Sequence, residues 1–418
     1  MLRKYASFFN QYHSQFWLIV TGNLLSTAGA SMIMPYLLIY ATNKLHIPLS
    51  EAATLITVSA ATTLFSSFLA GSLADRVGRK VIMNASLTIS GIAYLAMRFA
   101  VTYPSLAVLM LMIGFANALY SVGADAMLAD LVPTEKRADA YSINRIMNNA
   151  GFAIGPAVGG FLAAASYNLA FLAGAAGMLI YSALLFFRGR ETLHGDARPT
   201  TPRDSTLDAS PGGYGRVFRD GKFLTFIAVL SLGLVAPGML WVLLAVYTKS
   251  YFGLPENVYG WIPTTNALMC VFVQYMVTRV TRRHATLPVM AVGMLIYAFG
   301  VGSVALMSGF WGFWISMVIL TFGELTLIPT ASKFVADIAP ADMRGRYMSL
   351  YWLAWGFSRA AAPLIGGALN DYVSPQAIWI GGLVIGISSV TGLALLSSLG
   401  WYRSVGQLEQ ECLAVEAT

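Results

Sequence analysis

Long apolar runs recur along the whole chain, each of roughly 18 to 25 residues, the length that crosses the hydrocarbon core of a bilayer as a helix. Hydrophobic residues make up 57% of the 418 positions and the mean hydropathy is +0.66, which leaves too little polar surface for a water-soluble globule. The sequence therefore predicts an all-α membrane protein with twelve transmembrane helices. These lie near residues 16–40, 52–70, 81–101, 105–127, 140–163, 169–188, 223–247, 258–278, 286–306, 311–332, 347–369 and 376–400.

The basic residues are distributed by side of the predicted membrane. The chain has 26 Lys and Arg against 19 Asp and Glu, a formal net charge of +7. That excess alone would fit a nucleic-acid binder, but the basic residues gather in alternate interhelical segments, as the positive-inside rule describes. We expect both termini in the cytoplasm, no nucleic-acid partner, and a monomer embedded as a multi-pass protein in a bacterial cell membrane.

A polar segment rich in Pro, Gly, Ser and Thr divides the chain. Residues 189–221 predict a cytoplasmic linker between six-helix halves at 1–188 and 222–402, followed by a cytoplasmic tail at 403–418. The halves are related, because a shift of 207 residues aligns 129–162 with 336–369, with ten identities in 34 positions. Six helices per copy preserve sidedness, so the two six-helix repeats are parallel and a site between them is expected near the bilayer midplane.

Charge is concentrated in the stretch GSLADRVGRK, residues 71–80, between the second and third predicted helices. Together with twelve helices in two repeats, this stretch resembles the signature Gly-x-x-x-Asp-Arg-x-Gly-Arg-Lys of the major facilitator superfamily. The resemblance extends over essentially the whole chain and implies a secondary active transporter. The matching residues are Gly71, Asp75, Arg76, Gly78, Arg79 and Lys80.

The same resemblance implies a gating role for this loop. Asp75 would accept hydrogen bonds from the N-terminus of the eleventh helix, which begins near Arg346. Arg79 would reach Asp130 at the cytoplasmic end of the fourth helix. Such contacts form a gate that holds in one state and breaks in the other. The alternative is that these charges only follow the positive-inside rule, for which the acid Asp75 has no use.

The fifth predicted helix carries the stretch GFAIGPAVGG. Glycines four residues apart share one helix face and let two membrane helices approach closely. The pattern resembles the antiporter motif of drug:proton exporters, although close packing alone would also require the glycines. The motif residues are Gly151, Gly155, Pro156, Gly159 and Gly160. The Arg-x-x-Gln-Gly pattern common in the fourth helix of these exporters is absent, so we expect proton handling to be rearranged.

Ionisable residues inside the hydrocarbon are costly, which makes the few present candidates for proton coupling. Glu324 lies deep in the tenth predicted helix, and we predict that it binds and releases protons near neutral pH. Alternatively, Glu324 is a structural partner of Arg359, which lies at a similar depth in the eleventh helix. Asp125 and Arg145 also reach matching depths on the fourth and fifth helices, where they would form either a proton-handling pair or a static one.

The substrate cavity of this superfamily is lined mainly by helices one, four, seven and ten. Asn117 is the repeat equivalent of Glu324, which gives a polar pair across the pseudo-symmetry axis. Aromatic and methionine side chains suit lipophilic or cationic ligands. We expect the substrate to contact Asn23, Met34, Tyr40, Asn117, Trp241, Tyr247 and Arg359.

These features predict proton-coupled efflux of small lipophilic or cationic compounds by alternating access. One alternative keeps the fold but carries a single metabolite, peptide or lipid, and another is a membrane sensor that does not transport. The sequence contains no phosphate-binding loop, zinc-ligand pattern or nucleophile motif, so we expect no enzymatic activity, no metal and no cofactor. The energy source would then be the proton gradient.

Overall fold

The computed structural model describes residues 12–193, 213–340 and 343–399. Most of the predicted linker and the predicted tail lie outside the described residues. Within them the chain is helical and contains no strand, which confirms the all-α prediction. The helices of the first half are α2 (Ser14–Leu45), α3 (Leu49–Val77), α4 (Arg79–Met97), α5 (Tyr103–Leu131), α6 (Arg137–Ala165) and α7 (Tyr167–Arg188).

The second half begins with a short helix and contains one span in pieces. Its helices are α8 (Gly213–Arg219), α9 (Gly221–Phe252), α10 (Glu256–Tyr259), α11 (Trp261–Phe272), α12 (Gln274–Thr281), α13 (Thr286–Ser303), α14 (Gly309–Ile338), α15 (Arg344–Tyr372) and α16 (Ala377–Ser398). The predicted eighth span, near 258–278, corresponds to α10, α11 and α12. Its junction residues Gly260 and Val273 keep right-handed helical dihedral angles, so the three pieces follow one another along one span.

Local sequence explains where several helices begin. Thr102 caps α5 in a reciprocal capping box with Ser105, and Ser166 accepts a hydrogen bond from the backbone of Asn168 at the start of α7. Asp220 does the same for α9 through the backbone N–H of Phe223, at 3.0 Å. Each cap satisfies a backbone donor that the first helical turn cannot pair internally.

Nine helices of the described chain are long and apolar enough to cross a membrane. They are α2, α3, α4, α5, α7, α9, α13 with its short 3₁₀ extension, α14 and α16. The other three predicted spans coincide with α6, α15 and the segmented run α10–α12. Gly, Asn and charged residues lower the hydropathy of α6 and α15. The protein is a multi-pass integral membrane protein.

The helix bounds repeat with the offset found in the sequence. A shift of 207 residues carries α2 onto α9 and α6 onto α15 at both ends, because 14–45 becomes 221–252 and 137–165 becomes 344–372. The other long helices with an unbroken counterpart agree to within about three residues at each end. The two copies therefore share their helical framework as well as their sequence pattern.

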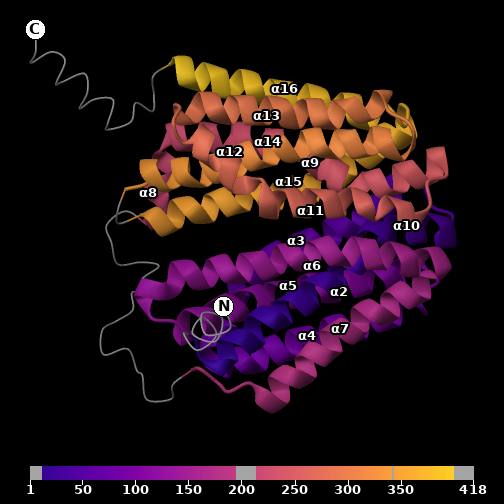
Figure 1. Ribbon diagram of the computed structural model, residues 1–418, viewed down its shortest axis with the longest axis vertical. Coiled ribbons are helices and arrows are strands. Elements are labelled where there is room, and N and C mark those ends of the chain that lie inside the picture. Colours follow the sequence, from indigo (N-terminus) through magenta and orange to yellow (C-terminus); the bar gives the residue numbers. More distant parts are fainter. Residues whose placement is uncertain (1–11, 194–212, 341–342, 400–418) are drawn as a thin grey trace, which may run out of the picture.

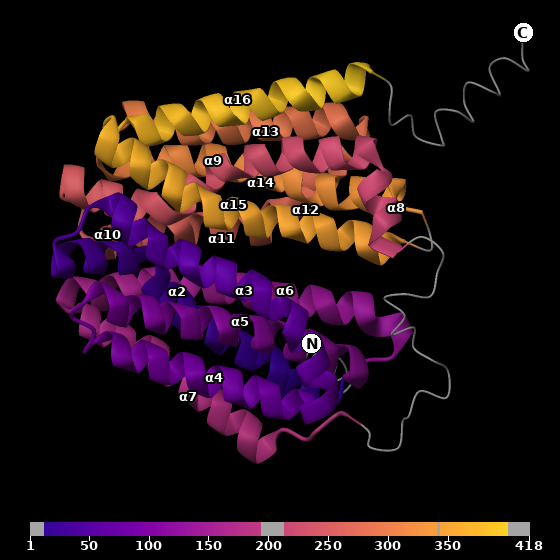
Figure 2. The same ribbon diagram turned by 180° about the vertical axis from the view of Figure 1, so that it is seen from behind.

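The two copies lie side by side, with α2–α7 on one side and α8–α16 on the other (Figure 1). The ribbons of the halves lie closest at the end that carries α10 and diverge toward the end that carries α8 (Figures 1 and 2). We call the end with α8 and residues 71–80 the motif end, and the opposite end, with α10, the far end. The charge distribution predicts that the motif end is cytoplasmic.

Candidate functional site

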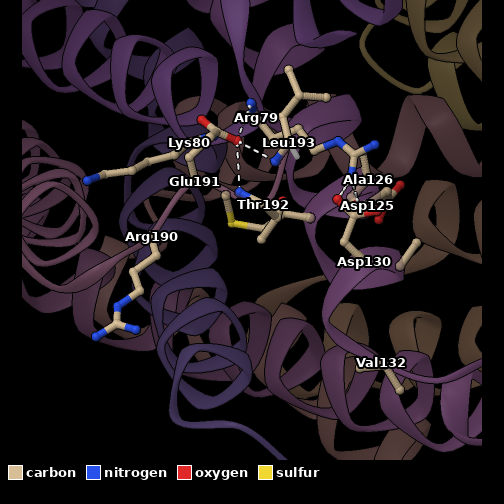
Figure 3. Close-up of polar contacts among 12 residues, drawn as sticks. Arg79, Lys80, Asp125, Ala126, Asp130, Val132, Arg190, Glu191, Thr192 and Leu193 are labelled. Carbon is tan, nitrogen blue, oxygen red and sulfur yellow. Dashed lines mark hydrogen bonds and ion pairs between the residues drawn. The ribbon is translucent and has the colours of Figure 1, made fainter. Parts of the chain in front are cut away.

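The charged loop at the motif end is organised around Arg79, the first residue of α4. Its side chain is 6% exposed and forms an ion pair with Asp130 near the end of α5, as the motif predicts. The Arg79 Nη1 also donates to the carbonyl oxygen of Ala126 at 3.3 Å (Figure 3). This arrangement joins α4 to α5 within the first half.

Sequence reasoning missed the residue that completes this loop, Glu191 (Figure 3). Its carboxylate accepts hydrogen bonds from the backbone N–H groups of Arg79 and Lys80 at the start of α4, both at 3.0 Å. It also accepts from the N–H groups of Thr192 and Leu193, at 3.0 and 3.1 Å. A single carboxylate thus satisfies donors of the α4 N-terminus and lies at its positive dipole end.

Gly78 explains why the motif needs a glycine before the arginine. Its φ is +107°, a conformation that side chains rarely adopt, and a Cβ there would lie 2.6 Å from the Glu191 Oε2. Arg190, the residue before Glu191, is bonded to α2, because the Gln15 side chain donates to the Arg190 carbonyl oxygen at 2.6 Å. The start of the predicted linker is therefore part of the motif end. An acid directly after the basic run 188–190 was the available sequence signal.

The predicted contact between Asp75 and the N-terminus of α15 is not present in this conformation. Asp75 is exposed and makes no hydrogen bond or ion pair within the described part of the chain. A Cβ added at Gly71 or at Gly345 would find no atom within 4 Å. The gate residues Arg76 and Asp75 therefore face open space, while Arg79 and Asp130 remain paired.

The glycine motif of α6 packs against other helices on two of its faces. Gly151, Gly155 and Gly159 face α2, where a Cβ would lie 2.8 Å or less from Thr27, Ser31 or Met32. This face explains the close packing of two helices within the first half.

The second face of the motif points across the interface between the halves. A Cβ at Gly160 would lie 2.3 Å from the carbonyl oxygen of Glu256, and one at Gly260 would lie 2.4 Å from the carbonyl oxygen of Pro156. Tyr36 donates a hydrogen bond to the Pro156 oxygen at 2.7 Å. Pro156 and Gly160 therefore form a backbone-to-backbone contact with α10 and α11 at the far end.

Two threonines join the halves at positions related by the repeat. Thr264 of α11 donates to the carbonyl oxygen of Ala153 on α6 at 2.7 Å. Thr57 of α3 donates to the carbonyl oxygen of Ala360 on α15 at 2.8 Å. Both donors and both acceptors are 207 residues apart, so the same bond occurs twice about the pseudo-symmetry axis.

Each side of the far end adds a carboxylate to this symmetric pair of bonds. Glu256, 5% exposed, accepts from the Tyr167 hydroxyl at 2.6 Å and pairs with Lys249 at 2.9 Å. Burial would raise the pKa of Glu256, but the Tyr167 and Lys249 hydrogen bonds and the Lys249 charge outweigh burial and hold the pKa below its usual value.

On the other side, Asp371 accepts from the backbone N–H of Ser50 at 2.7 Å. Burial would raise the pKa of Asp371, and hydrogen bonds from Ser50 and Asn370 overcome this and lower the pKa. Asp371 and Asn370 also line a pocket of about 200 Å³ between the halves, with residues of α2, α9 and the start of α3.

Glu324 lies in the middle of α14 and faces the segmented span. The buried amide of Asn266 on α11 donates to the Glu324 Oε2 at 2.9 Å and to the Thr321 hydroxyl at 3.0 Å. The Cys270 thiol lies one turn further along α11, 4.0 Å from the Glu324 Oε1. Arg145 of α6 interacts electrostatically with Glu324 and with Cys270 from the other half. Glu324 of the second half therefore lies within electrostatic range of Arg145 in the first half.

Neither of the two predicted ion pairs forms. Within the described residues, Arg359 and Arg145 make no ion pair, and the electrostatic neighbour of Glu324 is Arg145 rather than Arg359. Asp125 is exposed, and its backbone oxygen rather than its carboxylate accepts from Tyr141, at 3.3 Å. Matching depth in the sequence was therefore not sufficient to predict which charged side chains pair.

Two of the predicted cavity residues pack between helices of one half in this conformation. Tyr40 donates to the carbonyl oxygens of Met97 and Ala100, and its ring packs against Phe171 at 4.9 Å. Tyr247, 1% exposed, packs against Trp379 at 5.0 Å inside the second half. Both tyrosines belong to the packing between helices of one half, because their helices are apolar on every side and the sequence does not fix which face turns inward.

The remaining predicted cavity residues divide between packing and open positions. Asn23 is buried and donates to Asn144 of α6 at 2.9 Å, which fixes α2 against α6. Met34 is half-buried against the main core. Asn117 and Trp241 are exposed. Of these four, Asn117 and Trp241 remain open to a ligand in this conformation.

The sequence profile of the Major Facilitator Superfamily matches residues 19–249 and 234–403. The first match covers the first copy and most of α9, the second covers the second copy from the middle of α9 onward, and together they cover nearly the whole chain. The chain belongs to the major facilitator superfamily. It is a transporter and not an enzyme.

Relatives at low identity extend over almost the full length. The uncharacterized MFS-type transporter YttB of Bacillus subtilis is 27% identical over 89% of this chain and 92% of its own. The Na(+), Li(+), K(+)/H(+) antiporter of Planococcus maritimus is 25% identical over 82% and 87%. The multidrug resistance protein MdtH of Aeromonas hydrophila is 23% identical over 91% and 94%.

Among solved structures, the nucleoside transporter NupG superimposes with a TM-score of 0.76 at 13% identity, covering 91% of this chain and 99% of that one. At this identity the similarity establishes the fold, and the substrate has to be inferred from the residues of the site.

Proposed function

We propose that the protein exports small lipophilic or cationic compounds in exchange for protons, working by alternating access. The observation that carries the proposal is the position of Glu324. Its carboxylate lies deep in the membrane-spanning region, is held by Asn266 and Cys270 of α11, and interacts with Arg145 of the opposite half. A carboxyl in such a place is a default candidate for proton coupling.

The coupling follows from the charge on this carboxyl. A hydrogen bond to an ionised carboxylate is roughly twice as strong as one to a neutral group, so a proton on Glu324 weakens its bond with Asn266. The same proton removes its attraction to Arg145 across the interface. Because α11 also carries Thr264, which bonds α6, the charge on Glu324 acts on a helix that closes the far end. A cationic substrate would compete with the proton for the same carboxylate.

Two of the relatives support exchange rather than uptake, since one is named a cation/proton antiporter and another a multidrug resistance protein. The alternative is a carrier of one metabolite, peptide or lipid with the same fold. The breadth of the substrate range distinguishes these two functions. A suitable panel therefore contains lipophilic cations, amino acids, sugars, peptides and the ions Na⁺, Li⁺ and K⁺.

The test is transport by purified protein in liposomes with an imposed pH gradient. We expect Glu324→Gln to abolish gradient-driven efflux while leaving exchange down a substrate gradient measurable, because Gln still accepts from Asn266 but does not titrate. Glu135→Gln, at an exposed position between α5 and α6, is the matched control and should transport like the wild type. A Glu324→Gln protein that still pumps against a gradient at the wild-type rate would contradict the proposal.

A further inference from the structure

Arg359 occupies a defined side of α15, fifteen residues after its first residue, Arg344. Its two sequence neighbours fix the orientation of the helix. The Ser358 hydroxyl donates to the Ser231 carbonyl oxygen of α9 at 2.8 Å, and the Ala360 carbonyl oxygen accepts from Thr57 of α3. Arg359 therefore lies between the side packed on its own half and the side packed on the other half.

The remaining two sides of α15 differ in character. At 100° per residue, Leu353, Phe357 and Leu364 share one exposed side, which is apolar throughout. Trp352, 61% exposed, lies with Arg359 on the opposite side. A guanidinium facing lipid at this depth would be very costly, so the side with Trp352 and Arg359 faces the space between the halves.

Arg359 has no negative partner in the described part of the chain. It makes no hydrogen bond or ion pair there. Arg359 is exposed in this conformation. Glu324 accepts a hydrogen bond from Asn266 and forms no ion pair with Arg359 in the described chain. The space between the halves thus carries one positive charge that the protein does not compensate.

We propose that Arg359 binds an anionic group of the substrate, so that the transported compounds are zwitterions. The inference rests on the proposed function, in which a cationic group competes with the proton at Glu324. A guanidinium matches a carboxylate or phosphate through paired N–H donors, and the exposed ring of Trp352 offers a stacking surface for an aromatic body. Because Arg359 and Glu324 form no ion pair with each other, the two charged groups of the substrate would have separate partners in the protein.

Equilibrium binding to purified protein tests this inference without any gradient. The probes share one ring system: 6-(aminomethyl)-2-naphthoic acid is a zwitterion, its methyl ester is a cation, and 6-methyl-2-naphthoic acid is an anion. We expect the zwitterion to bind about tenfold or more tightly than the ester, the ratio expected for one charge-assisted hydrogen bond. Equal affinity of the ester and the zwitterion for the wild type would overturn the inference.

Arg359→Gln should remove this preference and bind both probes with the affinity of the ester. Arg359→Lys keeps the charge and should retain part of the preference. Arg98→Gln, at the exposed end of α4, is the matched control and should behave as the wild type. Because Arg359 makes no contact that the variant would lose, Arg359→Gln should melt no earlier than wild type, which separates a binding role from a structural one.

Failure of the anion-site inference can be distinguished from failure of the proposed proton-coupled export. Gradient-driven efflux of the methyl ester by the wild type tests the proposed function separately, because this cation uses Glu324 alone. If Arg359→Gln keeps the zwitterion preference while ester efflux continues, the inference is wrong and proton-coupled export stands. If wild-type protein prefers the zwitterion but pumps no probe against a pH gradient, the anion site stands and the proposed export is wrong.

Discussion

The two ends of this transporter differ in what joins the halves. At the far end, threonine bonds, close backbone contacts and two carboxylates connect α6 and α7 with α10 and α11, and α3 with α15. At the motif end, the strong contacts of Arg79, Asp130 and Glu191 all lie within the first half. The contacts that join the halves therefore lie at the far end, whereas the charged contacts of the motif end order the first half without joining it to the second.

The largest effect is expected from filling the backbone contact at the far end. Gly160→Leu places side-chain atoms where a Cβ already lies 2.3 Å from the Glu256 carbonyl oxygen, so the far end cannot close. We expect a loss of about 3 kcal/mol in stability and no transport. Gly345→Leu at the motif end is the control, since a Cβ there meets nothing within 4 Å, and thermal unfolding should leave its stability within about 0.5 kcal/mol.

A smaller effect is expected from Glu256→Gln, which leaves Lys249 without its counter-ion. Loss of one partner of a fully buried pair costs about 3–5 kcal/mol, and the Lys249 side chain is 34% exposed, so we expect about 2 kcal/mol. Thermal unfolding beside Glu135→Gln measures this difference. Equal stability of the two variants would mean that the Tyr167 and Lys249 contacts do not hold the far end.

The same carboxylates predict a pH dependence for the far end. The pKa values of Glu256 and Asp371 are lowered in this folded state, so their stabilisation is complete above the ordinary carboxyl pKa of about 4. It is lost as the pH falls through the lowered values, because protonation removes the charges. In Glu324→Gln, which lacks the response expected of Glu324 near neutral pH, spin labels at positions 51 and 372 should therefore separate only below about pH 4. Their separation near neutral pH in that variant would contradict this assignment.

The threonine bonds test the symmetry of the far end. Thr57→Val and Thr264→Val each remove one hydrogen bond to a backbone oxygen and should each cost about 1 kcal/mol. Because the two bonds lie on different helix pairs, the double variant should cost about the sum. Unequal single effects would show that the repeat symmetry of the bonds does not extend to their energies.

The smallest effect on stability is expected from Asp75→Asn, because Asp75 makes no contact in this conformation. Its predicted partner, the N-terminus of α15, becomes available only when the motif end closes. Transport should fall while the melting temperature remains close to wild type. Wild-type transport at equal expression would show that Asp75 has no part in the gate.

The sequence alone predicted much of the framework and less of the site. The spans, the 207-residue offset and the pairing of Arg79 with Asp130 follow from length, repetition and motif, which are local properties. The positions of Tyr40 and Tyr247 did not follow, because an all-apolar helix gives no signal of its rotation. Glu191 and Thr264 were missed because their partners are backbone atoms more than 100 residues away. Every residue has the same backbone groups, so the type of the partner residue does not reveal such a bond.

The central claim is that the charge on Glu324 decides which end of the molecule is closed. Distances between spin labels measure this directly, with one pair at positions 72 and 349 for the motif end and one at positions 51 and 372 for the far end. In wild-type protein, a pH change across neutrality should move the two pairs in opposite directions. In Glu324→Gln both pairs should stay fixed over the same range. A Glu324→Gln protein whose two distances follow pH as in the wild type would contradict the account.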